Sequence, residues 1–293
     1  MDPRRTLPAE FLAHFDDYLG GTSEPVPAKD ACTVVLIRDG VGPAAANQGA
    51  VEVYLLERHL GMAFAGGCWV FPGGGVDPRD FDAEIGWAGP SAAEWARVLA
   101  CDEATARALV CAAVRETFEE SGVLLAGPTW DAVVGDTTGD DWETDRRALE
   151  GRELSFTEFL SRRGLVLRTD LLRFWGRWIT PEFEPRRYDT RFFAAVLPDG
   201  QITRDVSTES ASVTWIPAMD AVRGAEAGEL TMLPPTLCTC MEVAEMPTAQ
   251  AVLASAASRH YEPVLPTMVV QEDGSGYIEL PPRLVELGKR WPR

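Results

Sequence analysis

Apolar residues along the chain fall into short runs that predict strands and into helical spacings that predict helices. The runs Cys32–Arg38 and Val51–Arg58 are rich in β-branched and apolar residues, and a loop rich in Gly, Ala and Pro separates them, which predicts a hairpin. A third short strand, Gly66–Phe71, leads into three consecutive glycines. The other predicted strands are Leu171–Thr180, Thr190–Leu197 and Ala211–Ile216.

Predicted helices flank these strands. Ser91 begins one of them as an N-cap, with Glu94 three residues later in the spacing of a capping box. The segment Trp130–Glu153 carries many acids and few apolar residues apart from its tryptophans, so it is expected to be a long surface excursion. The predicted helices are Glu10–Leu19, Ser91–Ala100, Ser155–Arg163, one from Pro217 through Arg223, Leu233–Met246 and Thr248–His260. Hairpin-spaced strands with helices packed outside them predict an α+β sandwich.

The most informative stretch is Cys111–Leu125, CAAVRETFEESGVLL. At about 100° per residue, three glutamates share one side of a helix, within an arc of roughly 100°, and an apolar set occupies the opposite side. Gly122 stands where a left-handed residue would end this helix. The glutamates are Glu116, Glu119 and Glu120, and the apolar set is Val110, Cys111, Val114 and Phe118.

Three acids on one turn are electrostatically costly for a helix. Like charges three or four positions apart cost roughly 0.2–0.5 kcal/mol per pair, and acids in the last turn oppose the helix dipole by about 0.3–1 kcal/mol each. A divalent cation would reverse both effects, because Mg²⁺ and Mn²⁺ choose carboxylate oxygens. The alternative is a solvated acidic face without a ligand.

A second motif precedes this helix. In Trp69–Asp77, WVFPGGGVD, a short apolar strand runs into Pro and three glycines, whose backbone can approach a ligand closely. Together the two stretches resemble the signature of the Nudix hydrolases, Gly-x5-Glu-x7-Arg-Glu-U-x-Glu-Glu-x-Gly-U, where U is apolar. Gly74 matches its first glycine, and the residues that match in register after it are Arg115, Glu116, Glu119, Glu120, Gly122 and Val123.

The motif is interrupted between its two halves. Gly74 and Arg115 stand 41 positions apart, which leaves about 27 residues more than the signature contains. Its first Glu therefore cannot be assigned: Asp80 stands at the right spacing from Gly74, whereas Glu103 stands only near the spacing counted back from Arg115, and neither is taken as a ligand. Such an insertion, about 78–102, resembles the Nudix branch of the peroxisomal coenzyme A diphosphatases. Weaker likenesses to that branch lie in Trp178–Pro181 and Arg186–Phe193.

The resemblance implies a Nudix-type α/β/α sandwich with a mixed sheet, and a pyrophosphohydrolase that cleaves a nucleoside diphosphate linked to another moiety. It implies Mg²⁺ or Mn²⁺ on Glu116, Glu119 and Glu120, with Arg115 orienting these carboxylates. Gly73 and Gly74 would let the loop close over the metal site. Candidate phosphate contacts are Arg58, Arg186, Arg187 and Arg191, and the candidates for the general base are Glu120 and Glu209.

Several functions remain open on this reading. Coenzyme A or acyl-CoA is the preferred substrate, while ADP-ribose, NADH and nucleotide sugars are alternatives. A non-catalytic Nudix-fold regulator that senses a nucleotide is the rival from another class. Nudix relatives are often dimers, so a homodimer is expected.

The composition of the chain limits the binding partners and the compartment that we expect. With 45 acidic against 27 basic residues, the formal net charge is −18, a surface that repels nucleic acid and anionic lipid, so neither is expected as a partner. The N-terminus lacks the apolar core of a signal peptide, no run approaches 18 apolar residues, and the chain ends in Arg-Trp-Pro-Arg rather than Ser-Lys-Leu, so the cytoplasm is the expected compartment. Six cysteines, mostly in apolar runs, are expected to be reduced thiols, and the three histidines show no zinc spacing.

The expected organisation has three parts. Residues 1–30 form an N-terminal helix and linker, and residues 31–230 form the Nudix domain. Residues 231–293 form a C-terminal helical extension packed on the same domain.

Overall fold

The β-hairpin at the start of the chain is the centre of the fold. The computed structural model describes residues 14–15, 17–21, 24–40, 50–62, 65–82, 84–259, 262–270 and 276–291. Strands β1 (Lys29–Asp39) and β2 (Val51–Arg58) pair antiparallel, with Ile37 opposite Val53. The predicted hairpin is confirmed.

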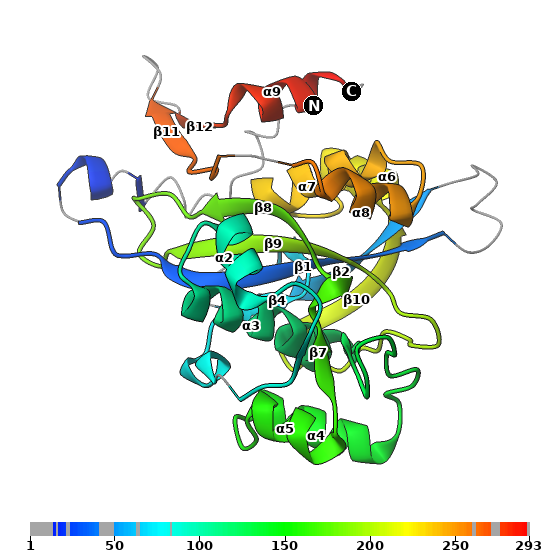
Figure 1. The fold of residues 1–293 in the computed structure, drawn as a ribbon. Coiled ribbons are helices and arrows are strands. Elements are labelled where there is room, and N and C mark those ends of the chain that lie inside the picture. The colour runs from blue at the N-terminus through cyan, green and yellow to red at the C-terminus, as the bar shows by residue number, and fades with distance from the viewer. Residues whose placement is uncertain are drawn as a thin grey trace.

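A mixed sheet grows outward from this hairpin in the order β10-β2-β1-β9-β8 (Figure 1). Strands β1 and β9 run parallel, with Lys29 opposite Tyr188, and the other pairs of this sheet are antiparallel. The third predicted strand is reduced to the two residues of β3, which pairs with β2, and the glycines form β4, which pairs with β1. The remaining strands of the sheet are β3 (Trp69–Val70), β4 (Gly73–Gly75), β8 (Arg173–Ile179), β9 (Tyr188–Val196) and β10 (Ser210–Pro217).

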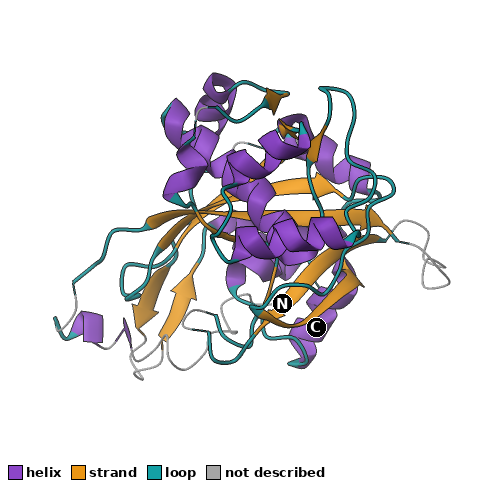
Figure 2. Ribbon diagram, turned by 90° about the horizontal axis from the view of Figure 1, so that it is seen from below, coloured by secondary structure: helices purple, strands orange, loops and turns teal. Residues whose placement is uncertain are grey.

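Successive side chains of β1 enter two different cores, because side chains alternate between the faces of a strand. Val35 and Ile37 pack in the core beneath helices α6 (Ala218–Ala227), α7 (Pro234–Ala244) and α8 (Ala249–Ala256). Val34 and Leu36 pack in the second core, beneath helices α2 (Ala92–Leu99) and α3 (Glu103–Ser121). Helices thus cover both faces of the sheet (Figure 1), and the view from below shows helices in front of the strands (Figure 2). The predicted α+β sandwich is confirmed.

The insertion within the motif is folded onto the domain. Ser91 caps α2 with the predicted capping box, in which Glu94 bonds back to Ser91. Trp95 of this helix is buried, and its ring meets that of Phe193 edge-on at 5.7 Å. The insertion also contains the short 3-10 helix η3 (Pro78–Phe81) and strand β5 (Trp87–Ala88).

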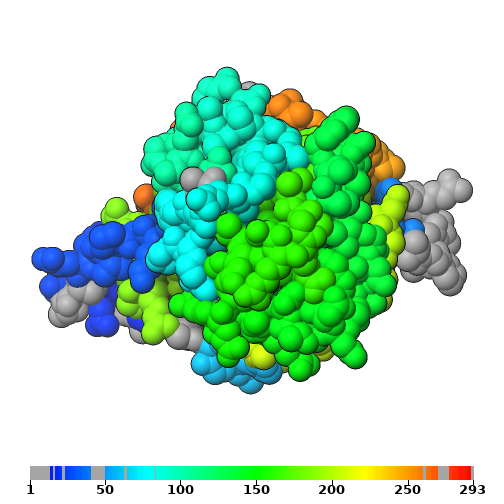
Figure 3. Space-filling model, turned by 60° about the horizontal axis from the view of Figure 1, so that its bottom comes forward, coloured from blue at the N-terminus to red at the C-terminus, as the bar shows by residue number. Residues whose placement is uncertain are grey.

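A second, small sheet ties the insertion to a later part of the chain. Its order is β5-β7-β6, with β7 (Val166–Arg168) parallel to β5 and β6 (Ala126–Gly127) antiparallel to β7. The 3-10 helix η4 (Thr169–Leu171) follows β7. In the space-filling view the cyan insertion and the green segment after α3 lie side by side (Figure 3).

The prediction for Trp130–Glu153 is wrong over its second half. Residues Asp140–Glu150 form helix α4, and the predicted helix α5 (Phe156–Arg163) follows, with Ser155 as its N-cap. Part of the acidic charge that suggested a surface excursion is neutralised within the fold, since Glu143 and Glu150 both pair with the buried Arg146. Trp142 supplies the apolar contact, with its ring edge-on to Phe118 of α3 at 6.4 Å.

The C-terminal part continues beyond the predicted helices. Strands β11 (Thr267–Val270) and β12 (Gly276–Glu279) form a hairpin, and α9 (Pro282–Lys289) follows. Leu237 of α7 and Leu284 of α9 belong to the same core as Val35 of β1. Half of the predicted helix Glu10–Leu19 lies outside the described residues, and Phe15 in its described part packs on Phe183.

Two further sequence expectations concern chemistry and membranes. All six cysteines are free thiols, and all except Cys101 are buried. Within the described ranges, no helix has both the length and the apolar character needed to cross a bilayer.

Candidate functional site

The glycine strand β4 lies directly against the acidic turn of α3. An added Cβ on Gly74 would come within 2.6 Å of the Glu116 carboxylate, and one on Gly73 within 2.3 Å of the Cys32 carbonyl oxygen. Real Cβ atoms do not approach other atoms this closely, so position 73, which faces backbone, needs glycine, and a side chain at position 74 would displace the Glu116 carboxylate. The two halves of the motif, far apart in sequence, are therefore in contact in the fold.

Each of the three predicted glutamates is held by a hydrogen bond at or next to this contact. The Gly73 amide donates to Oε2 of Glu120 at 2.8 Å. Nη1 of Arg115 donates to Oε1 of Glu116 at 2.7 Å and to Oε2 of Glu119 at 3.2 Å. Glu119 and Glu120 are only 7% exposed, so they are not the solvated acidic face of the alternative interpretation.

Asp80 is the partner that the interrupted motif left unassigned. Nε and Nη2 of Arg115 each donate to one of its carboxylate oxygens at 2.9 Å. Asp80 is buried, and η3 holds it in place because its carboxylate also accepts the Asp77 amide at 2.8 Å. Glu103, the other candidate, is the exposed first residue of α3. The structure therefore places Asp80 beside Arg115 and leaves Glu103 outside the site.

The site carries an excess of negative charge. The carboxylates of Asp80, Glu116 and Glu119 contact the guanidinium of Arg115, and Glu120 adds a fourth carboxylate on the same turn, held by the Gly73 amide. Burial and the neighbouring Glu116 raise the pKa of Glu119 to about 7. Burial likewise raises the pKa of Glu116, and burial together with Glu116 raises the pKa of Glu120 well above its ordinary value. A group of carboxylates that resists ionisation in this way is suited to a bound cation.

The donor set fits a hard divalent cation, although the side chains do not converge around a single point. Among the described residues, no three His, Cys, Asp or Glu side chains lie closely enough together to hold an ion as they stand. The reason is visible in the hydrogen bonds, since Arg115 holds Glu116 and Glu119 while the Gly73 amide holds Glu120. The oxygen-only chemistry suits Mg²⁺ or Mn²⁺.

The C-terminal end of α3 is stabilised by groups that sequence reasoning missed. Gly122 ends the helix with a φ of 74°, as predicted. Three carbonyl oxygens at this end accept hydrogen bonds. Nη1 of Arg146 donates to the Glu119 carbonyl oxygen at 2.7 Å, and the Arg204 amide donates to that of Ser121 at 2.9 Å. The Thr137 hydroxyl donates to the Gly122 carbonyl oxygen at 2.6 Å. Cations at a helix C-terminus offset the dipole, so Arg146 and Arg204 counter part of the cost of the acids.

Of the candidate contacts outside the motif, Arg58 and Glu209 come to the site. They form an ion pair at 3.2 Å, and His59 donates its amide to the Glu209 carbonyl oxygen at 3.1 Å. Burial and Glu116 raise the pKa of Glu120 most strongly. Among the smaller effects, Arg58 lowers this pKa and Glu209 raises it, so both residues are within electrostatic reach of the acidic turn.

The other predicted arginines occupy different surroundings. Arg187 donates to the carbonyl oxygens of Thr180 and Val26, at 3.1 and 2.7 Å. Arg186 is exposed, and Arg191 is buried and ion-paired with Asp30 and Asp189. Over the described part of the chain, the hydrogen bonds and ion pairs of Arg187 and Arg191 do not reach the acidic turn. The phosphate contacts of all three arginines stay a prediction.

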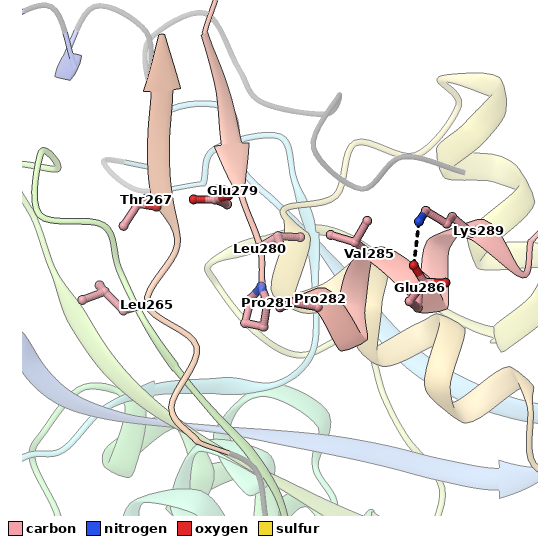
Figure 4. A pocket seen from close by; sticks show the side chains of 9 residues that line it. All are labelled: Leu265, Thr267, Glu279, Leu280, Pro281, Pro282, Val285, Glu286 and Lys289. Carbon is pink, nitrogen blue, oxygen red and sulfur yellow. Dashed lines mark hydrogen bonds and ion pairs between the residues drawn. The ribbon is translucent and has the colours of Figure 1, made fainter.

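A hollow of about 550 Å³ lies elsewhere, between the C-terminal hairpin and α9 (Figure 4). Its walls are Leu265, Thr267, Glu279, Leu280, Pro281, Pro282, Val285, Glu286 and Lys289, and Glu286 and Lys289 form an ion pair across its edge. None of the residues of the acidic turn lines it. The hollow is therefore separate from the site built by α3 and β4.

Comparison with known proteins identifies the family. Residues 96–243, about half of the chain, match a family model described as the NUDT19 Nudix domain. The chain belongs to the Nudix hydrolase family. The crystal structure of a Nudix hydrolase from Alicyclobacillus acidocaldarius is similar, with a TM-score of 0.66 and 29% identity over 78% of this chain and 96% of that one.

The curated relatives of this Nudix hydrolase include one whose name gives a substrate. The chain is 25% identical to the acyl-coenzyme A diphosphatase NUDT19 of Gallus gallus, over 87% of this chain and 78% of that protein. It is 29% identical to a nudix hydrolase of Caenorhabditis elegans over 63% of this chain, but the match spans only 52% of that relative's length. The resemblance to the coenzyme A diphosphatase branch is confirmed by the Gallus gallus relative and by the matching family model.

Proposed function

We propose that this Nudix hydrolase cleaves the pyrophosphate of a nucleoside diphosphate linked to another moiety, with Mg²⁺ or Mn²⁺ held by Glu116, Glu119 and Glu120. The observation that carries the proposal is the charge of the site, where three carboxylates of a largely buried cluster share the guanidinium of Arg115 and Glu120 adds a fourth carboxylate on the same turn. Such crowding is costly without a cation and is favourable with one.

Each protein group has a role that follows from its contacts. Arg115 orients Glu116 and Glu119, and Asp80 anchors Arg115. The backbone of Gly73 fixes Glu120 and brings the loop onto the acidic turn. When bound, the divalent cation neutralises charge on the pyrophosphate and lowers the pKa of the attacking water.

Glu209 is our candidate for the general base. Glu120 is buried and held by the Gly73 amide, whereas the Glu209 side chain is about half exposed and open to water, beside the same cluster. In the proposed step, water gives its proton to Glu209 and forms a bond to one phosphorus. The phosphoanhydride bond to the other phosphate then breaks, which leaves two phosphomonoesters.

Coenzyme A or acyl-CoA is the preferred substrate of the proposal. The names of the curated relatives from Gallus gallus and Xenopus laevis support it, at 25% and 23% identity. ADP-ribose, NADH and nucleotide sugars share the pyrophosphate and stay alternatives.

A substrate panel tests both levels of the proposal. The purified chain would be incubated with each compound and with Mg²⁺, Mn²⁺ or EDTA, and the phosphomonoester products would be identified by mass spectrometry. We expect cation-dependent cleavage, fastest with coenzyme A or acyl-CoA. Cleavage of ADP-ribose without turnover of coenzyme A would refute the preferred substrate, and no cleavage of any compound would favour a non-catalytic nucleotide sensor. Sedimentation velocity of the same sample tests the predicted homodimer.

A further inference from the structure

A continuous chain of hydrogen bonds joins the acidic turn of α3 to the residue before Glu209. Nη1 of Arg146 donates to the Glu119 carbonyl oxygen at 2.7 Å and to Oε2 of Glu150 at 3.0 Å. Oε1 of Glu150 accepts from the amide of Thr208 at 2.8 Å and from its hydroxyl at 2.7 Å. This connection runs from the acidic turn to the neighbour of the candidate base, although α4 itself contains no residue of the family motif.

Further hydrogen bonds hold Arg146, the residue in the middle of this connection. The side chain of Arg146 is almost fully buried, and its Nε and Nη2 are held by the two oxygens of Glu143 at 3.0 and 2.9 Å. Glu143 also accepts from Nη1 of Arg204 at 2.9 Å, and the Arg204 amide donates to Ser121 at the end of α3. A second branch therefore fixes the start of the same loop, residues 204–209, to the same helix end.

The position of Glu209 depends on this loop. Its side chain pairs with Arg58 at 3.2 Å and is half exposed, so the surrounding backbone must set where its carboxylate lies. The carbonyl oxygen of Glu209 is held by the His59 amide, and the preceding residue, Thr208, is held by Glu150. A catalytic group that is misplaced by about 1 Å can cost roughly 10²-fold in rate.

We propose that Arg146 and Glu150 of α4 are positioning residues, which hold Glu209 in register with the metal-binding turn of α3. This inference rests on the proposed function, because it takes Glu209 as the general base. It assigns a role in the reaction to a helix that follows the Nudix box and touches no reacting atom.

Kinetics of three variants test the proposal in the intact chain. Glu150→Ala removes the acceptor for Thr208, and we expect kcat to fall about 10-fold or more with KM changed less than about threefold, because substrate contacts are untouched. Glu150→Gln keeps one acceptor oxygen for Thr208 and should recover part of the loss. The matched control is Glu153→Ala, the same substitution at an exposed position three residues later, with kcat as in the wild type.

A double-mutant cycle separates positioning of the base from general damage. If Glu150 acts through Glu209, then Glu150→Ala should cost little more in a Glu209→Gln background. Multiplicative losses would contradict the proposal, as would a Glu150→Ala variant with wild-type kcat. Should Glu150→Ala fail to fold, Thr208→Val at an exposed position replaces it in the cycle, since it removes the hydroxyl donor alone.

Hydrogen exchange supplies a readout that is independent of activity. The Thr208 amide is bonded to Glu150, so peptides covering 204–209 should exchange faster in Glu150→Ala than in Glu153→Ala, with α3 peptides unchanged. Equal exchange in the two variants would overturn the positioning role. A wild-type chain inactive on the whole substrate panel would instead refute the proposed function, and the two failures are thus distinguishable.

Discussion

Arg115 and Asp80, 35 positions apart in the chain, form a two-pronged ion pair in which Nε and Nη2 each donate to one carboxylate oxygen at 2.9 Å. The pair closes the interrupted Nudix box, because the arginine that Asp80 anchors also holds Glu116 and Glu119. The residue that completes the site therefore lies at the start of the insertion, and β5 and α2 follow it in the chain.

Asp80→Asn is expected to loosen this anchor. Removing one partner of a buried ion pair typically costs about 3–5 kcal/mol. Because Arg115 keeps its other partners, we expect the free energy of unfolding to fall by about 3 kcal/mol. Urea unfolding measures this change. Asp82→Asn, at an exposed position of the same segment, is the control and should unfold like the wild type. An Asp80→Asn protein as stable as the control would show that Arg115 does not depend on this pair.

Glu119→Gln and Glu120→Gln should lower the activity of the protein while raising its stability without metal. Removing a group that binds the cation is expected to lower kcat by about 10²-fold or more. The metal-free variants should nonetheless be more stable than the wild type near pH 8, because a buried negative charge is lost from a crowded cluster. Glu103→Gln, on the same helix but exposed, should change neither quantity. Activity retained in Glu119→Gln and Glu120→Gln would rule out the proposed ligand set.

The raised pKa of Glu119 predicts how the stability of the metal-free protein depends on pH. Its value of about 7 in the fold exceeds that of an ordinary glutamate, so between these two values the folded state binds more protons than the unfolded state. Stability should therefore fall as pH rises from about 4.5 to about 7, by on the order of 3 kcal/mol from this group. Unfolding midpoints in EDTA at several pH values, compared with Glu119→Gln, isolate the contribution.

Adding Mn²⁺ should reverse this trend, because a cation binds the ionised carboxylates of the folded state. At about 100 times its Kd the stabilisation is about 2.7 kcal/mol, and it should grow as pH rises. A pH dependence that Glu119→Gln leaves unchanged would mean that other groups are responsible. A stability that Mn²⁺ does not alter at any pH would argue against a cation on this turn.

Gly74→Ala tests the contact between the two halves of the motif. The new Cβ would lie within 2.6 Å of the Glu116 carboxylate, so the Glu116 side chain, which Arg115 holds, must move. We expect weaker Mn²⁺ binding by calorimetry and a lower kcat. The matched control is Gly75→Ala, where the added Cβ meets no atom within 4 Å. Equal behaviour of the two variants would show that the close approach is not needed.

Local sequence was sufficient for many elements of the fold. The hairpin, the strands β8 to β10, the capping box of α2 and the end of α3 at Gly122 could all be predicted from apolar runs, capping residues and a glycine. The acidic turn and its likeness to the Nudix signature were also visible, because the residues concerned are close together in the chain. These features depend on neighbours within one or two helical turns.

Helix α4 was missed because its acids were interpreted without their partners. Its sequence did contain a signal, since Glu143 and Arg147 stand four positions apart, as do Arg146 and Glu150, which is the spacing of helical ion pairs. What outweighed this signal was the low apolar content of the segment. Burial of Arg146 against α3 depends on distant backbone, and no local pattern reveals it.

The sequence by itself determined most of the secondary structure and the chemistry of the acidic turn, because both arise from residues adjacent in the chain. Only the tertiary structure decided that Asp80 meets Arg115, that Glu119 and Glu120 are buried, and that Glu209 acts electrostatically on Glu120. Ionisation, burial and pairing are properties of the surroundings, and the folded chain assembles those surroundings from segments that the sequence keeps apart.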